Sequence, residues 1–304
     1  MNEVDIASLN KKHGIAGKIE FTSGQGGLPV AIITNVFAKV SVAIYGAHVL
    51  SYRPKGQEEV LWMSSLSTFE EGNPIRGGIP ICFPWFGPHV SDSQRPQHGF
   101  ARLQMWKVAK TANLSEGETQ LRLTLRQNPK LKALWKYSFL AEMIITVGAS
   151  LNVAFRCTNT GMEQFSYTGA LHSYFTVSDI ANVKIKGLGG SRYYDGMGAT
   201  VPSTQEEDSL EIQKEENRRY INTTSDCIIE DSGLSRKIRI GKTGSRITVV
   251  WNPGAEMAKK IADMPDDGYK TMVCVEAVNA YDDIAVVQPK GSCTLSTIIA
   301  VEAY

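Results

Sequence analysis

Apolar and polar residues alternate with a period of two along much of this chain. The alternation is clearest at residues 39–44, 121–126 and 151–156, and further runs lie at 183–186, 237–240, 246–251 and 292–302. Successive side chains of a strand point to opposite faces, so each run predicts a strand with one buried face. Helical patterning is confined to two short segments, at 129–135 and 254–264. The sequence therefore predicts an all-β protein, built as a large antiparallel β-sandwich.

Composition narrows the classes of protein to which the chain can belong. Its 304 residues carry a net charge of +1, which gives no general field for a polyanion, so we expect no nucleic acid partner. No apolar run approaches the roughly 18 residues of a membrane span, and no apolar signal core follows a basic N-terminus. We therefore expect no membrane partner and a cytoplasmic location. Because composition shifts nowhere as a linker would, we predict a single domain over residues 1–304.

Several other motifs are absent or weak. The five cysteines are Cys82, Cys157, Cys227, Cys274 and Cys293. They are scattered without metal-ligand or redox spacing and mostly lie in apolar runs, which favours packing roles. The glycine-rich segments 24–27 and 187–190 open no helix after a buried strand and are predicted to be turns rather than phosphate loops. No cluster of histidines and acids has metal-ligand spacing.

Two residues about a hundred positions apart are the candidate acid–base pair. His172 and Glu276 each lie in a strand-like run. An imidazole that gives a proton and a carboxylate that takes one are the minimum equipment for general acid–base catalysis. Taken alone, such residues more often serve packing or surface roles. Two further segments, 74–88 and 96–102, add two arginines and a second histidine, which favours a functional reading.

Five separated motifs resemble those of the glucose-6-phosphate 1-epimerases, the hexose-6-phosphate mutarotase branch of the aldose 1-epimerase family. They are Pro74–Pro80, Gln97–Arg102, Leu171–Phe175, Val249–Pro253 and Cys274–Glu276, in that order. The resemblance spans roughly residues 30–302. It implies a large antiparallel β-sandwich of the galactose mutarotase type, which agrees with the period-two pattern.

The resemblance also implies a reaction, the interconversion of the α and β anomers of a hexose 6-phosphate. Glu276 would take the proton of the anomeric hydroxyl while His172 gives one to the ring oxygen, and the ring opens. Rotation about the bond between the first two carbons and closure then give the other anomer. His98 would hydrogen-bond the sugar near its ring oxygen. The reaction implies no metal and no other cofactor.

The phosphate contacts follow from the same resemblance. Arg76 and Arg102 would hold the 6-phosphate, because a guanidinium offers a planar fork of donors that matches phosphate oxygens. Gln97 would add a neutral donor. Gly77 and Gly78 would let the backbone approach the ligand closely.

One position departs from the family pattern. The family usually has an aspartate that contacts sugar hydroxyls, and alignment on Tyr220 places Asn217 there. An amide can still accept and donate hydrogen bonds but carries no charge, so the sugar preference is less defined than the reaction. Glu216 and Asp195 are alternatives for this contact.

Rival functions remain open at this point. An epimerase acting on unphosphorylated hexoses is the nearest, and a carbohydrate-binding protein without turnover is another. A glycoside hydrolase needs a second acid placed across the sugar, which the sequence does not offer. We expect a monomer whose one partner is its small-molecule substrate, a hexose 6-phosphate.

Overall fold

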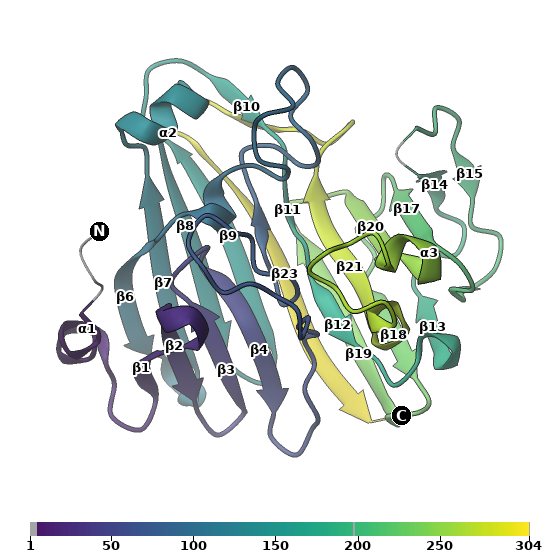
Figure 1. Cartoon of the computed structure of the whole chain (residues 1–304), viewed down its shortest axis with the longest axis horizontal. Helices are drawn as coiled ribbons and strands as arrows, with labels where there is room; N and C mark the ends of the chain where they lie inside the picture. Colours follow the sequence, from purple (N-terminus) through teal and green to yellow (C-terminus); the bar gives the residue numbers. More distant parts are fainter. Residues whose placement is uncertain (1–4, 197, 304) are drawn as a thin grey trace.

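Strands make up most of the protein. The computed structural model describes residues 5–196 and 198–303. The helices are short: α1 (Ile6–His13), α2 (Pro129–Leu134) and α3 (Gly254–Ala258). Figure 1 shows α1 and α2 at the margins of the strands and α3 in front of the strands near β17 and β20. No helix in the described part of the chain is long and apolar enough to cross a membrane.

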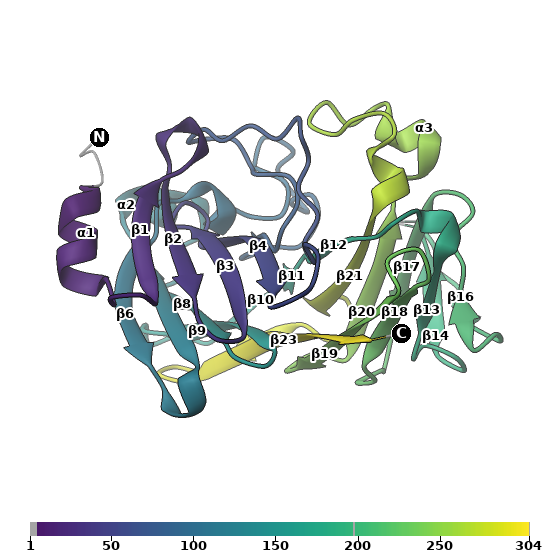
Figure 2. The same cartoon turned by 90° about the horizontal axis from the view of Figure 1, so that it is seen from below.

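A nine-stranded antiparallel sheet forms one layer. Its strands, in spatial order, are β16 (Ser209–Leu210), β13 (Val183–Lys186), β18 (Cys227–Asp231), β19 (Arg236–Thr243), β23 (Ser292–Ala303), β9 (Leu151–Asn159), β8 (Phe139–Val147), β7 (Thr119–Arg126) and β6 (Lys107–Asn113). The long strand β23 pairs with β9 on one side and β19 on the other, so the last strand of the chain joins the two halves of the layer. Figure 2 shows it crossing the middle of the molecule.

Two sheets form the facing layer. One contains β1 (Ile19–Ser23), β2 (Pro29–Thr34), β3 (Ala38–Ala43) and β4 (His48–Pro54) in chain order. The other follows the order β15 (Ser203–Thr204), β14 (Arg192–Asp195), β17 (Glu216–Tyr220), β20 (Ile247–Asn252), β21 (Met272–Asn279), β11 (Gly169–Leu171) and β5 (Ile81–Cys82), with β12 (Tyr174–Thr176) also paired to β21. A small sheet pairs β10 (Phe165–Tyr167) with β22 (Ala285–Val287).

The alternation of the sequence fills the space between the layers. One hydrophobic cluster includes Val40 of β3, Leu123 of β7, Ile238 of β19 and Val275 of β21, all almost inaccessible to water. It is therefore continuous across both layers. The all-β sandwich predicted from the sequence is confirmed, and each of the predicted strand runs is found as a strand.

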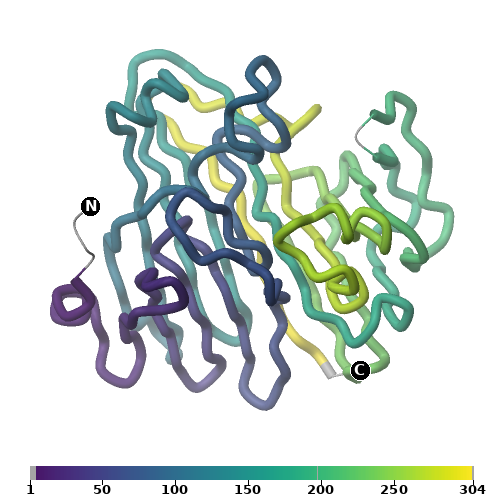
Figure 3. The backbone as a smooth tube through the Cα atoms, viewed as in Figure 1, coloured from purple at the N-terminus to yellow at the C-terminus, as the bar shows by residue number. Residues whose placement is uncertain are grey.

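The eight-stranded sheet is covered on its outer face as well. Val250 and Val275 point into the sandwich, whereas their neighbours Val249 and Trp251 pack in separate clusters on the opposite face. In Figure 2 the segments between β4 and β6 and around α3 rise from this side. The backbone trace in Figure 3 shows these two segments, far apart in sequence, next to each other in front of the strands.

The helix predictions were partly wrong. The segment 254–264 forms only the short helix α3, after which the chain continues in turns to Met264, the residue before Pro265. Helix α1 was missed. Asp5 caps it, accepting hydrogen bonds from the amides of Ala7 and Ser8.

A substitution at Gly99 tests whether close packing against the backbone of Phe83 holds the loop that carries His98. Its φ is +76°, and a Cβ atom there would lie 2.1 Å from the carbonyl oxygen of Phe83. Gly99→Ala should lower the free energy of unfolding by about 2–4 kcal/mol, because the left-handed strain adds to a backbone clash. Gly190→Ala is the matched control, with φ +72° and no atom within 4 Å of the added methyl. It should cost about 1 kcal/mol. If urea unfolding showed equal losses of unfolding free energy in Gly99→Ala and Gly190→Ala, the backbone clash at residue 99 would be contradicted.

Candidate active site

A cleft of about 370 Å³ opens on the outer face of the eight-stranded sheet. Its lining comes from the segment between β4 and β6, from β12 and the connection that precedes it, from β17, β20 and β21 with adjacent residues, and from α3 and the segment after it. The lining residues are Arg76, Phe86, Gly87, Gln97, His98, His172, Tyr174, Glu215, Asn217, Arg219, Val249, Trp251, Met257, Ile261, Glu276 and Tyr281.

Strand register brings the candidate acid–base pair together. Leu171 pairs with Ala277 and Tyr174 pairs with Cys274, so His172 between them lies across from Glu276. The His172 Nε2 and Glu276 Oε1 atoms are 3.4 Å apart. The imidazole ring stacks on Tyr174 at 4.8 Å and meets the edge of Trp251. Packing therefore fixes the orientation of the ring toward the carboxylate.

Burial changes the acidity of both groups. It raises the pKa of Glu276 well above its ordinary value, because a carboxylate loses its hydration there. It also lowers the pKa of His172 well below its ordinary value, and the charges around the cleft, including Arg76 and Arg102, add to this. Glu276 Oε2 and His172 Nδ1 have no hydrogen-bond partner among the described residues. The arrangement keeps one proton within reach of two groups that both resist ionisation.

His98 faces the same cleft as a neutral donor. The amide of Gly87 donates to its Nδ1 at 3.1 Å, so the proton of the neutral ring is on Nε2. Burial and, to a smaller extent, the charges of Arg102 and Arg76 together lower the pKa of His98 to about 3. Its ring centre lies 5.6 Å from that of His172. The second histidine can thus donate a hydrogen bond but does not readily become charged.

Arg76 lines the cleft with a partner already in place. Its Nη2 lies 2.9 Å from Asp263 Oδ1, its Nε donates to the same oxygen, and its Nη1 donates to the hydroxyl of Tyr174. Asp263 is supplied by the segment after α3. Part of the arginine charge is therefore neutralised before any ligand binds.

Arg102 lies just behind the lining. Its Nη2 donates to the carbonyl of Gln97 at 2.8 Å, and its Nε has no partner among the described atoms. Gln97 itself is exposed at the rim. Burial lowers the pKa of Arg102. The two arginines singled out by the sequence therefore differ in their contacts. Arg76 is paired with an acid, whereas Arg102 donates to a backbone carbonyl at the rim.

Gly77 and Gly78 do not serve ligand approach as the sequence suggested. Both have positive φ, and added Cβ atoms would lie 2.4 Å from the carbonyl oxygen of Trp62 and 2.2 Å from that of Val49. His48 is buried there and contacts the carbonyl oxygen of Gly77 at 2.7 Å. The glycines allow two protein segments to pack closely, which is a structural role.

Strand β17 places one of the three candidates for the sugar-hydroxyl contact in the lining of the cleft. Asn217 lines the cleft. Glu216 points to the other face, where it forms an ion pair with Arg218 at 3.0 Å, and Asp195 is exposed outside the lining. Neither alternative acid can take the place of Asn217. The sequence reasoning missed Glu215 and Arg219, although the period-two rule places residue 219 on the same face as residue 217.

One group of side chains in the cleft could hold a metal ion. Ligand atoms of His172, Cys274 and Glu276 lie within 4.8 Å of one another. Burial raises the pKa of the Cys274 thiol well above its ordinary value, which opposes the thiolate that a metal prefers. The expectation that no metal or other cofactor takes part stays a prediction.

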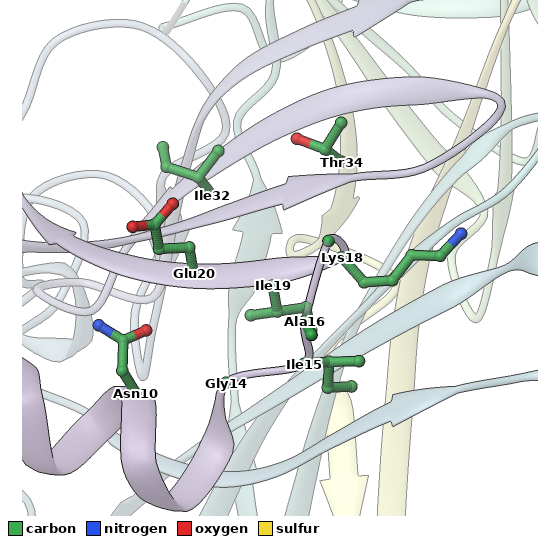
Figure 4. Close-up of a pocket in the computed structure, with 10 residues that line it drawn as sticks. Asn10, Gly14, Ile15, Ala16, Lys18, Ile19, Glu20, Ile32 and Thr34 are labelled. Carbon is green, nitrogen blue, oxygen red and sulfur yellow. The ribbon is translucent and has the colours of Figure 1, made fainter.

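A larger hollow lies beside α1, lined by residues of α1, of the connection from α1 to β1, and of β1 and β2 (Figure 4). Its amide side chain, Asn10, is already bonded to the backbone of Phe21. Lys18 and Glu20 are its ionisable residues. Without convergent functional groups, this hollow offers no chemistry comparable to that of the cleft.

Curated relatives match most of the chain. A Salmonella typhimurium protein that carries the provisional name glucose-6-phosphate 1-epimerase is 36% identical over 271 residues, which cover 89% of this chain and 90% of that protein. A protein of the same provisional name from Escherichia coli is 35% identical, over 86% of this chain and 87% of its own length.

Solved structures agree in fold. A crystal structure from Salmonella typhimurium, provisionally described as a mutarotase (YeaD), has a TM-score of 0.89 at 32% identity and covers 98% of this chain and 100% of its own. A galactose mutarotase-like protein from Clostridium acetobutylicum, at 13% identity, has a TM-score of 0.74 over 94% of this chain and 98% of its own. The aldose 1-epimerase family model matches residues 30–300. The chain therefore belongs to the aldose 1-epimerase family, and it shares the β-sandwich of the galactose mutarotase-like proteins.

Proposed function

We propose that this protein is an isomerase that interconverts the α and β anomers of hexose 6-phosphates, chiefly glucose 6-phosphate. One observation carries the proposal: the buried His172–Glu276 pair, 3.4 Å apart, faces a cleft with a cationic edge. The names of the Salmonella typhimurium and Escherichia coli relatives support the choice of substrate.

In the proposed reaction the pair moves one proton in each direction. Glu276 removes the proton of the anomeric hydroxyl, His172 delivers a proton to the ring oxygen, and the bond between the first carbon and the ring oxygen breaks. The open aldehyde rotates, and closure reverses both transfers. At the end the pair holds the same single proton as at the start, so no further reactant is needed.

Burial of the pair supports this exchange. The neutral imidazole with a protonated carboxyl and the imidazolium with a carboxylate contain the same number of protons. Burial favours the neutral form, whereas direct contact between opposite charges favours the ionised form. The proposed reaction uses the ionised form, which transfer of one proton between groups 3.4 Å apart generates from the neutral form.

The neighbouring residues position the sugar in this proposal. His98 donates its Nε2 proton to oxygen atoms near the ring oxygen, and Asn217 contacts hydroxyls at the β17 side. Arg76 and Gln97 bind the 6-phosphate at the opposite edge, with Arg102 supporting Gln97 and adding charge. We also propose that the enzyme works as a monomer in the cytoplasm, with neither nucleic acid nor membrane as a partner. The net charge of +1 supports the absence of a nucleic acid partner, because it gives no general field for a polyanion.

The acid–base pair gives the first kinetic prediction. His172→Ala and Glu276→Gln should each slow anomer exchange of glucose 6-phosphate by about two to four powers of ten, because each removes one proton carrier. Exchange is measured by NMR above the uncatalysed rate, and binding by calorimetry should persist. Glu216→Gln is the control, since Glu216 is also buried but faces away from the cleft. A wild-type rate in either cleft variant would remove that residue from its role.

The pH dependence of the rate should be a bell. The reactive pair holds one proton, so the rate falls on the acid side when it gains a second and on the alkaline side when it loses the first. Because burial raises the pKa of Glu276 and lowers that of His172, the limbs belong to the pair and not to either residue. In Glu276→Gln the residual rate should lose the bell, because one of its two groups no longer titrates. A residual rate that keeps both limbs would contradict the assignment.

Phosphate selectivity separates this enzyme from an epimerase of free hexoses. Arg102→Ala or Arg76→Ala should lower kcat/KM for glucose 6-phosphate by at least about tenfold, roughly 1.4 kcal/mol, while the slow rate on glucose changes little. Lysine at either position should restore part of the loss, since it keeps the charge but not the fork.

Arg95→Ala provides the control for this measurement, because Arg95 pairs with Asp92 outside the cleft. Coupled assays on fresh α-glucose 6-phosphate and α-glucose give both numbers. Equal losses on both sugars would assign the arginines to the ring site or the fold and would favour a general aldose epimerase. Sugar binding without any turnover would favour a carbohydrate-binding protein.

A further inference from the structure

Arg219 occupies the end of the cleft away from the proposed phosphate contacts. Register aligns Arg219 with Val249 and Val249 with Glu276, so the three residues form one row across β17, β20 and β21. At a strand spacing of about 4.8 Å, the Cα atoms of Arg219 and Glu276 are about 10 Å apart. The short side chain of Val249 lies between them as part of the floor of the cleft.

Aromatic rings hold the Arg219 side chain in place. Its guanidinium carbon lies 4.5 Å from the ring centre of Tyr281 and 5.4 Å from that of Tyr194. The residue is 6% exposed. One long hydrogen bond, 3.4 Å from Nη2 to the carbonyl oxygen of Ala199, is its polar contact with the described protein. Stacking thus fixes the guanidinium without using most of its five N–H donors.

The charge of Arg219 has no acidic partner within residues 5–196 and 198–303. Its Nε is buried and makes no hydrogen bond to a described atom. The neighbouring Arg218 is the contrast, since it pairs with Glu216 at 3.0 Å and donates to Gln205 on the other face. A buried cation with unused donors is costly unless a ligand completes its contacts.

We propose that Arg219 is a specificity-determining residue that donates charge-assisted hydrogen bonds to ring hydroxyls of the sugar. The inference rests on the proposed function and adds a second polar subsite to it, on the side opposite the phosphate. Asn217, two residues earlier on the same face, completes this subsite with an amide. A guanidinium gives donors only, so it recognises hydroxyl oxygens as acceptors and leaves their protons to the amide oxygen.

The test combines a residue change with the removal of single hydroxyls. Arg219→Met keeps an apolar stem and removes the donors. For glucose 6-phosphate it should lower kcat/KM by about 10- to 100-fold, mainly through KM, with kcat within about twofold. One of the 2-, 3- and 4-deoxyglucose 6-phosphates should lack the hydroxyl that Arg219 contacts. Wild type should have a lower kcat/KM for that sugar, and Arg219→Met should lower it further by less than about threefold. Arg219→Lys should restore part of the loss on glucose 6-phosphate.

Arg218→Met is the matched control, and it should leave kcat/KM unchanged even if its melting temperature falls. Calorimetric binding of the same sugar phosphates provides a readout that needs no turnover. A wild type that binds these sugars without exchanging anomers would refute the proposed function and leave the Arg219 contact measurable. An equal loss on glucose 6-phosphate and all three deoxy sugars would refute the hydroxyl contact, as would an unchanged KM in Arg219→Met.

Discussion

The site depends on strand β21 being buried on both faces. All eight of its residues are buried, with Val273 and Val275 facing the sandwich core and Glu276 facing the cleft on the opposite face. If β21 were covered on one face only, the Glu276 carboxylate would be exposed to water and burial would not raise its pKa. The second cover comes from the loop segments 55–106 and 253–271. The fold therefore creates an acid–base group by enclosing a face that most antiparallel sheets leave exposed.

The cleft gathers charged residues that are satisfied to different degrees. Arg76 has Asp263, Arg102 has a backbone carbonyl, and Arg219 has mainly aromatic rings. His172 and Glu276 contact each other, and His172 Nδ1 and Glu276 Oε2 have no partner among the described residues. Incomplete satisfaction of buried polar groups is unfavourable for folding alone. Its concentration in one cleft is typical of a surface whose remaining partner is a ligand.

The strands could be predicted because alternation of apolar and polar residues is a local feature of the sequence. The contacts that complete the site join residues far apart in the sequence and could not be predicted. Alternation at residues 151–156 predicts a strand, but nothing nearby indicates that β9 pairs with the last strand of the chain. Asp263 lies 187 residues from Arg76, and no spacing rule connects them. Arg219 shares a face with Asn217 by periodicity alone, but which face becomes the cleft depends on distant loops. Helix α1 buries no residue completely, so its apolar pattern was too weak to detect.

The Arg76–Asp263 ion pair bears on how tightly the enzyme can hold its ligand. Substrate and product of the proposed reaction differ only in the configuration at one carbon. A cleft that binds one anomer tightly therefore also releases the other slowly. Energy gained equally by substrate and transition state lowers KM without raising kcat. In the proposed phosphate site, Asp263 withholds part of the charge of Arg76 from the ligand, which favours brief residence in a cleft whose substrate and product bind alike.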